Sequence, residues 1–190
     1  MKAFLITTLA LASMGCAVAQ DPHEPPPPPP MRGDAASLQD TMKFIQDKLP
    51  SKVNLMVYAH DNVAGTDKSV HLSVDVSNVS ANPDRCRIDF HWLVIVDGKA
   101  NSDKDTGFLL KDAQEIVVMP FEQEQQLKTA KAGHPERSVK VDPPAFALIV
   151  KRSDAKENDF DFYDETMANR VAKALQHAVD LCGGGNQEPF

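Results

Sequence analysis

Six polar side chains that could bind a metal ion alternate with apolar residues along three consecutive segments of the chain. They are Tyr58, His60, His71, Asp75, Asp89 and His91. Imidazole and carboxylate groups are common protein ligands of zinc and copper. If the hairpins placed Tyr58 opposite His71, and His71 near His91, this face could bind either ion. The solvated face of an ordinary antiparallel sheet shows the same alternation. This second interpretation predicts no metal site and no cofactor.

Sequence motifs of the common catalytic sites are missing from the chain. It has no G-x-S-x-G, H-E-x-x-H or C-x-x-C motif, and no glycine loop placed to hold a phosphate. The neighbouring carboxylates Asp164 and Glu165 lie at a predicted helix start, where the helix dipole accounts for them. The formal net charge of −7 argues against nucleic-acid binding, which needs a basic surface. We therefore predict a protein that is not an enzyme and does not bind nucleic acid.

Residues 1–19 have the features of a secretory signal peptide. Lys2 supplies the positive charge, a short apolar run follows, and A-V-A at residues 17–19 is a cleavage site. An alternative is a lipobox ending at Cys16, which would then carry a lipid. No other run of the sequence approaches the ~20 apolar residues of a spanning helix. We expect an exported protein, periplasmic or secreted, without a transmembrane segment.

Proline-rich sequence separates the signal peptide from the predicted domain. Residues 20–36 include six consecutive prolines at positions 25–30, which favour an extended polyproline II rod. Its proline and charge content gives this segment no core to join, so we predict a disordered linker. A glycine-rich tail at residues 183–190 is predicted to be flexible. The folded domain is therefore expected to span residues 37–182.

Helices are predicted at both ends of this domain. Ser37 is a good N-cap for the first helix, and Pro50 ends it. Its apolar stripe consists of Leu38, Met42, Ile45 and Leu49. Asp164 is the expected cap of the last helix, which Gly183 follows. Both helices have one apolar face, so both are expected to pack against the rest of the domain.

Between the helices the apolar period changes from 3.6 to 2, which is typical of antiparallel strands with one buried face. Strands are predicted over residues 52–60, 69–78, 86–96, 108–119 (one or two strands), 138–142, 145–151 and 159–163. Asp97-Gly98 is a tight-turn signal. Residues 120–138 have no clear pattern apart from a possible helical turn at 122–128 and a loop at 133–135.

About seven antiparallel strands followed by an amphipathic helix is an element order that resembles pleckstrin-homology-like (PH-like) domains. The resemblance covers residues 52–182 and rests on this order and on the segments FLLKDAQEIVVM, AFALIVK and DFDFYDETMANRVAKALQHAV. The chain is also similar to uncharacterised exported bacterial proteins. The resemblance implies an α+β fold with an N-terminal helix, a PH-like β-barrel and a C-terminal capping helix. Phosphoinositide binding is not expected, because the first hairpin sets Lys68 against Asp61 and Asp67.

Two cysteines remain after removal of the signal peptide, Cys86 and Cys182. An even number of cysteines in an oxidising compartment favours a disulfide. Cys86 opens a predicted strand on its core side, and Cys182 ends the last helix on its apolar face. In the architecture that the chain resembles, the helix caps the barrel, so its last turn could lie over a strand end. We predict a bond between these cysteines, with two buried thiols as the alternative.

The sequence therefore predicts location and fold better than activity, because a common fold carries many functions. We expect a non-enzymatic cell-envelope module that binds a protein, a peptide or a wall component. The alternative is a small-ligand carrier that uses the barrel mouth or a groove beside the helix. A cleft with converging titratable groups of shifted pKa would instead favour an enzyme.

Overall fold

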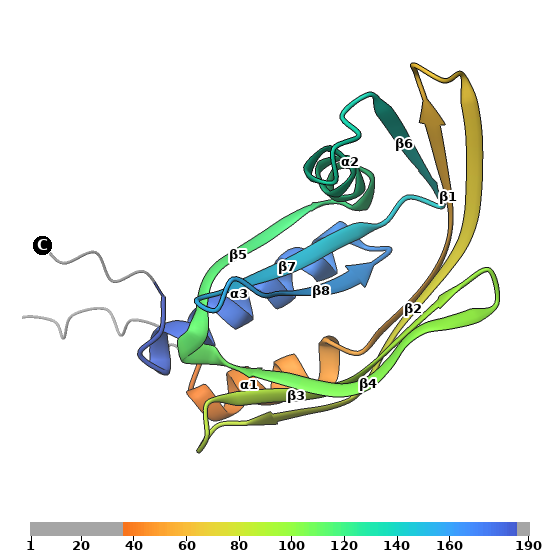
Figure 1. The fold of residues 1–190 in the computed structure, drawn as a ribbon. Helices are drawn as coiled ribbons and strands as arrows, with labels where there is room; N and C mark the ends of the chain where they lie inside the picture. Colours follow the sequence, from red (N-terminus) through yellow and green to blue (C-terminus); the bar gives the residue numbers. More distant parts are fainter. Residues whose placement is uncertain (1–35, 186–190) are drawn as a thin grey trace, which may run out of the picture. The chain divides into compact units, whose positions relative to one another are not determined.

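The computed structural model describes residues 36–185. They form an α+β fold with three α-helices and eight strands in two antiparallel sheets (Figure 1). The predicted signal peptide, the lipobox at Cys16, the proline run and residues 186–190 of the tail lie outside the described residues.

Five strands form the larger sheet, in the order β4-β3-β2-β1-β6. Their bounds are β1 Ser51–Asp61, β2 Thr66–Asn82, β3 Arg87–Val96, β4 Lys99–Leu109 and β6 Arg137–Asp142. Each neighbouring pair is antiparallel. Asp97 and Gly98 join β3 to β4 with φ angles of 48° and 76°. Positive φ at both positions is what the predicted two-residue hairpin turn requires.

Three strands form the smaller sheet, in the order β5-β7-β8. Their bounds are β5 Ala113–Pro120, β7 Phe146–Arg152 and β8 Glu157–Phe162. A short 3₁₀ helix, η1 (Leu110–Asp112), connects β4 to β5. The expected barrel of about seven strands is not confirmed, because the described strands pair within two separate open sheets. Alternating polarity predicts which face of a strand is buried, but it does not specify which strand edges pair.

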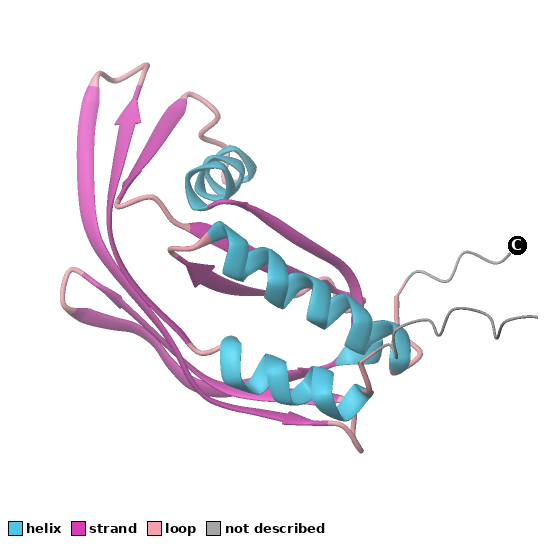
Figure 2. Ribbon diagram, turned by 180° about the vertical axis from the view of Figure 1, so that it is seen from behind, coloured by secondary structure: helices cyan, strands magenta, loops and turns pink. Residues whose placement is uncertain are grey.

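The three α-helices are α1 (Leu38–Lys48), α2 (Phe121–Lys131) and α3 (Glu165–Leu181). The side chain of Ser37 caps α1 by accepting a hydrogen bond from the Asp40 N–H. Asp164 caps α3, as predicted. Figure 2 shows α1 and α3 side by side, with α3 along the smaller sheet. The last helix therefore covers a sheet face and does not plug a barrel.

The main core lies among α1, α3 and both sheets. Ile45 of α1, Leu175 of α3 and Phe108 of β4 are all fully buried in it. The rings of Phe90 and Phe160 meet edge to face across the two sheets, with 5.0 Å between their centroids. The first helix is thus held in the fold by its apolar stripe, as the sequence predicts.

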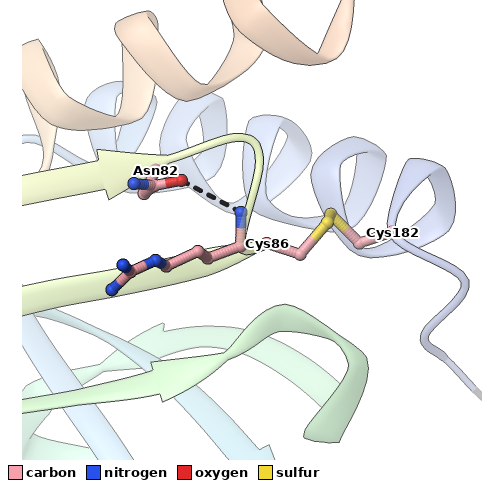
Figure 3. Close-up of a disulfide and its surroundings, with 4 residues drawn as sticks. Asn82, Cys86 and Cys182 are labelled. Carbon is pink, nitrogen blue, oxygen red and sulfur yellow. Dashed lines mark hydrogen bonds between the residues drawn. A yellow bond between two sulfur atoms is a disulfide. The ribbon is translucent and has the colours of Figure 1, made fainter.

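Cys86 and Cys182 form a disulfide with a Cα–Cα distance of 5.9 Å (Figure 3). Cys86 lies in the turn between β2 and β3, where the Asn82 side chain accepts a hydrogen bond from the Arg85 N–H. Cys182 follows the last residue of α3. The bond agrees with the predicted pairing and links the C-terminal helix to the larger sheet.

Two elements were not recognised in the sequence. Strand β4 is an edge strand whose residues 99–107 are mostly exposed, so it has no apolar alternation. Helix α2 was predicted only as a helical turn. Its buried positions are Phe121 and Glu124, and the carboxylate at the second position hides the amphipathic pattern.

Candidate functional site

The six residues of the predicted polar face do not converge on one point. In the β1–β2 register Tyr58 lies opposite Ser69, and His71 lies opposite Met56. The predicted pairing of Tyr58 with His71 is therefore wrong, because the turn at residues 62–65 sets a different register. His91 pairs with Ser77 of β2, which is six positions from His71, or about 20 Å along the strand.

Four of the six residues, His60, Asp75, Asp89 and His91, instead contact an oppositely charged or imidazole partner close to them. His60 contacts Asp67 at 2.7 Å, Lys52 contacts Asp75 at 3.4 Å, and Arg87 contacts Asp89 at 2.7 Å. His91 contacts Asp103 at 3.3 Å and Asp105 at 3.0 Å. Between residues 36 and 185 no group of three His, Cys, Asp or Glu side chains is arranged to hold a metal ion. This face is a set of exposed pairs, each contributing about 0–1 kcal/mol.

A groove of about 540 Å³, here the outer groove, nevertheless includes part of this face. Tyr58 lines it and is 45% exposed. The other lining side chains on the outward face are His60, Asp67, Ser69, Ser138 and Lys140. They come from three neighbouring strands, β2, β1 and β6. The groove offers hydroxyl, imidazole and ammonium groups to a polar ligand.

A second groove, here the α2 groove, has a volume of about 520 Å³ and lies between α2 and β6. Its apolar lining residues are Pro120, Leu127, Val139, Val141, Pro144, Ala145 and Phe146. Leu127 is 48% exposed although it is apolar. Strand β6 separates the two grooves, because its alternate residues line opposite sides.

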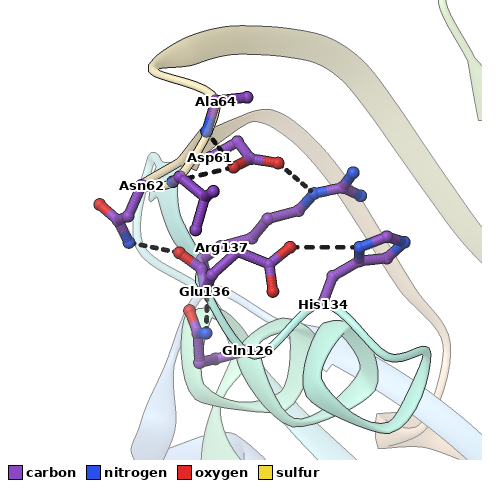
Figure 4. A network of polar contacts seen from close by, with 8 residues as sticks. Asp61, Asn62, Ala64, Gln126, His134, Glu136 and Arg137 are labelled. Atoms are coloured by element: carbon purple, nitrogen blue, oxygen red, sulfur yellow. Dashed lines mark hydrogen bonds and ion pairs between the residues drawn. The ribbon is translucent and has the colours of Figure 1, made fainter.

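A polar network holds the α2 end of β6 to the β1–β2 hairpin (Figure 4). The Asp61 carboxylate accepts hydrogen bonds from the N–H groups of Ala64 and Val63, and from Arg137 of β6. The bond from Ala64 is the largest cause that lowers the pKa of Asp61. The Asn62 side chain donates to the Glu136 carbonyl. These contacts fix the position of β6 relative to the hairpin tip.

Gln126 of α2 binds the free edge of β6 with its side-chain amide. Its Nε2 donates to the Arg137 carbonyl, and its Oε1 accepts from the Val139 N–H at 3.1 Å. The contact is side chain to backbone, so no residue pattern in the sequence indicates it. It connects the helix that lines one wall of the α2 groove to the strand that lines the other.

Four ionisable side chains lie close together between α2 and the smaller sheet. Lys128 Nζ lies 2.6 Å from Glu124 and 2.8 Å from Asp159. Asp161 is 4% exposed, and its Oδ1 has no hydrogen-bond partner among the described residues. Burial, followed by the charges of Glu124 and Asp159, raises the pKa of Asp161 to about 8. Burial likewise raises the pKa of Glu124, against the opposing effect of Lys128.

This acidic cluster was not recognised in the sequence. Two signals of it are present in the sequence. Glu124 and Lys128 are spaced as an i,i+4 pair of opposite charge, and Asp159 and Asp161 alternate with the buried phenylalanines of β8. Glu124 is 3% exposed, and neither Glu124 nor Asp161 lines either groove. The pKa values of Glu124, Lys128 and Asp161 are raised, but the two buried carboxyl groups, Glu124 and Asp161, do not reach either groove.

Comparison with protein-family models, with curated proteins and with solved structures found no match. The resemblance to PH-like domains and to exported bacterial proteins therefore stays a prediction. None of the helices that the structure describes has both the length and the apolar character needed to cross a membrane.

Proposed function

We propose that this protein is an exported, non-enzymatic cell-envelope module that binds a protein or peptide partner in the α2 groove. The observation that carries the proposal is the composition of this groove. An exposed leucine, Leu127, faces an apolar wall that includes Val141 and Phe146. Pockets with an apolar lining and a few polar groups at the rim are typical of ligand-binding sites.

The disulfide supports the exported location. Disulfides form and persist in oxidising compartments and are rare in the reducing cytosol. The bond between Cys86 and Cys182 is consistent with export, which the sequence predicts from residues 1–19.

The chemistry of the two grooves favours binding over catalysis. The polar groups at the α2 groove are two carboxamides, Gln123 and Gln126, and one carboxylate, Glu122. The outer groove contains a His60–Asp67 pair. Among the described residues no serine, threonine or cysteine side chain forms a hydrogen bond with this histidine. Its polar side chains suit a wall component, which is the other partner class that we expect for this module.

A pair of surface variants tests the proposal. The purified protein would be cross-linked in an envelope extract as wild type, as Leu127→Glu and as Tyr58→Ala. Leu127 and Tyr58 are both about half exposed, so neither substitution should unfold the chain. We expect Leu127→Glu to lose a specific cross-linked partner that Tyr58→Ala retains. Equal partner recovery by all three proteins would contradict the assignment of binding to the α2 groove.

The same groove also suits the alternative function, a carrier of small apolar ligands. Its volume of about 520 Å³ lies within the usual range for small-molecule sites. A fluorescent apolar probe, N-phenyl-1-naphthylamine, would be titrated into wild type and Leu127→Glu. Saturable binding that Leu127→Glu abolishes, without any groove-dependent protein partner, would favour the carrier.

A further inference from the structure

The edge of β6 that faces away from β1 lies beside α2, and the Gln126 side chain of that helix forms hydrogen bonds with part of this edge. Every residue of β6 lies opposite a residue of β1, from Arg137 opposite Asp61 to Asp142 opposite Met56. The Val139 N–H instead bonds to Gln126, on the side away from β1. Because backbone groups alternate in direction along a strand, the N–H and C=O groups of Val139 and Val141 both point away from β1.

Gln126 contacts this edge in the way that a residue of a parallel strand would. In a parallel ladder, one residue donates its N–H to a carbonyl and accepts from the N–H two positions further along. The Gln126 amide makes this pair of bonds with the Arg137 carbonyl, shown in Figure 4, and with the Val139 N–H. The next equivalent pair of groups on β6 is the Val139 carbonyl and the Val141 N–H. Both residues line the α2 groove.

Other free edges of the larger sheet are protected by different means. Strand β4, at the opposite edge, carries the charged residues Asp103, Lys104 and Asp105. Charges on an edge strand discourage pairing with another chain. Strand β1 extends beyond β6, and there the Tyr163 hydroxyl bonds to both the N–H and the carbonyl of Asn54. Strand β6 also carries a charge, Lys140, but this residue lines the outer groove. The residues of β6 that line the α2 groove, Val139 and Val141, are apolar.

We propose that an extended peptide of a partner protein adds to β6 in the α2 groove, parallel to that strand. The proposal rests on the proposed function and specifies the chemistry of its partner. One peptide residue donates its N–H to the Val139 carbonyl and accepts a hydrogen bond from the Val141 N–H. Its apolar side chains contact Leu127 and Phe146. Main-chain bonds supply affinity in this mode of recognition, and alternate side chains supply specificity.

The probe for this proposal is a phage-displayed library of random linear dodecapeptides, selected on the full chain. Selected peptides would be synthesised and titrated calorimetrically against wild type, Leu127→Glu and Tyr58→Ala. Tyr58→Ala is the matched control, because Tyr58 of β1 lines the outer groove, on the other face of the sheet from the α2 groove. We expect Leu127→Glu to weaken binding by about tenfold or more, and Tyr58→Ala to leave it unchanged. Thermal unfolding of both variants checks that they are folded.

Backbone methylation of the peptide separates strand addition from other modes of groove binding. N-methylation at one position should weaken binding about tenfold, because it removes the donor to Val139. Hydrogen exchange of the Val141 amide should slow when the peptide is bound.

The remaining outcomes separate the two proposals. Peptides that depend on Leu127, tolerate methylation at every position and leave Val141 exchange unchanged would overturn strand addition while the proposed function stands. If no selected peptide depends on Leu127, both proposals fail. Groove binding of N-phenyl-1-naphthylamine without any groove-dependent peptide would overturn strand addition and favour the carrier.

Discussion

The two faces of the smaller sheet are buried by different kinds of residue. One face, here the Phe160 face, consists of Leu148, Val150, Phe160 and Phe162, and it packs in the core that includes α3. The other, here the Asp161 face, consists of Ala147, Ile149, Asp159 and Asp161. It lies toward α2, whose buried residues are Phe121 and Glu124. The Phe160 face is apolar apart from Asn158, while the Asp161 face buries carboxylates beside aliphatic side chains.

The difference affects how firmly each helix is attached. The α3 helix contributes five fully buried side chains, Ala168, Val171, Leu175, Ala178 and Val179, to the core. It is also bonded covalently through Cys182. The α2 helix buries Phe121 and is otherwise held by contacts of Glu124, Gln126 and Lys128. We infer that α3 is the more stably attached helix, while α2 borders the proposed binding groove and depends on polar contacts.

The largest expected effect is on the Phe160 face. Phe160 is fully buried and contacts Phe90 across the sheets. Replacing it with alanine removes most of a core side chain and leaves a cavity. We expect Phe160→Ala to lower the free energy of unfolding by about 3–5 kcal/mol, measured by chemical denaturation. Phe160→Leu is the control and should cost clearly less. A loss below about 1 kcal/mol for the alanine variant would show that this face is not the main core.

The next largest effect is expected from removal of the disulfide, which should affect α3 but not α2. The disulfide closes a loop with a sequence separation of 96 residues, and a bond of this kind stabilises a domain by about 2–4 kcal/mol. We expect Cys86→Ser combined with Cys182→Ser to lower the free energy of unfolding by this amount. Hydrogen exchange should speed up at the end of α3 but not in α2. If hydrogen exchange accelerated equally in both helices, the bond would stabilise the whole domain and not α3 in particular.

The same contrast explains which parts of the fold could be predicted. The apolar alternation of β1, β2, β3 and β7 and the stripes of α1 and α3 specify these elements, because their buried faces are apolar. The pattern fails for α2, because Glu124 occupies a buried position, and for β4, whose residues are exposed. Neither the two-sheet arrangement nor the α2 groove follows from alternation. Both depend on which strand edges remain free, and on side-chain-to-backbone contacts such as that of Gln126.

Replacing Asp161 is expected to have a smaller effect on the free energy of unfolding, and in the opposite direction. Its pKa is raised from 3.8 to about 8 by burial, so the folded state keeps a proton that the unfolded state releases near pH 4. The stability that this group contributes is present below pH 4 and is lost as the pH rises to about 8. We expect Asp161→Asn to increase the free energy of unfolding by about 1–3 kcal/mol at pH 8, and to leave it nearly unchanged at pH 4.

Denaturation of wild type and Asp161→Asn between pH 4 and 9 checks this expectation. Asp159→Asn is the matched control, because Asp159 lies on the same face but contacts Lys128. It removes an ionic partner of that lysine and should destabilise the fold. A pH dependence that is identical in wild type and Asp161→Asn would mean that Asp161 is ionised and paired in the folded protein.

The smallest expected effect lies where the two sheets meet. The hydroxyl of Tyr163, directly after β8, accepts a hydrogen bond from the Asn54 N–H at 2.6 Å and donates to the Asn54 carbonyl at 3.0 Å. Tyr163→Phe removes both bonds and keeps the ring. Since Tyr163 is 46% exposed, water replaces part of the loss, and we expect a cost of about 0.5–1.5 kcal/mol. Tyr58→Phe, at an equally exposed tyrosine in β1 of the larger sheet, is the control and should cost almost nothing. If the two variants were equally stable, the Tyr163 hydroxyl would not be protecting the free edge of β1. Faster exchange of the Asn54 amide in Tyr163→Phe alone would show that it does.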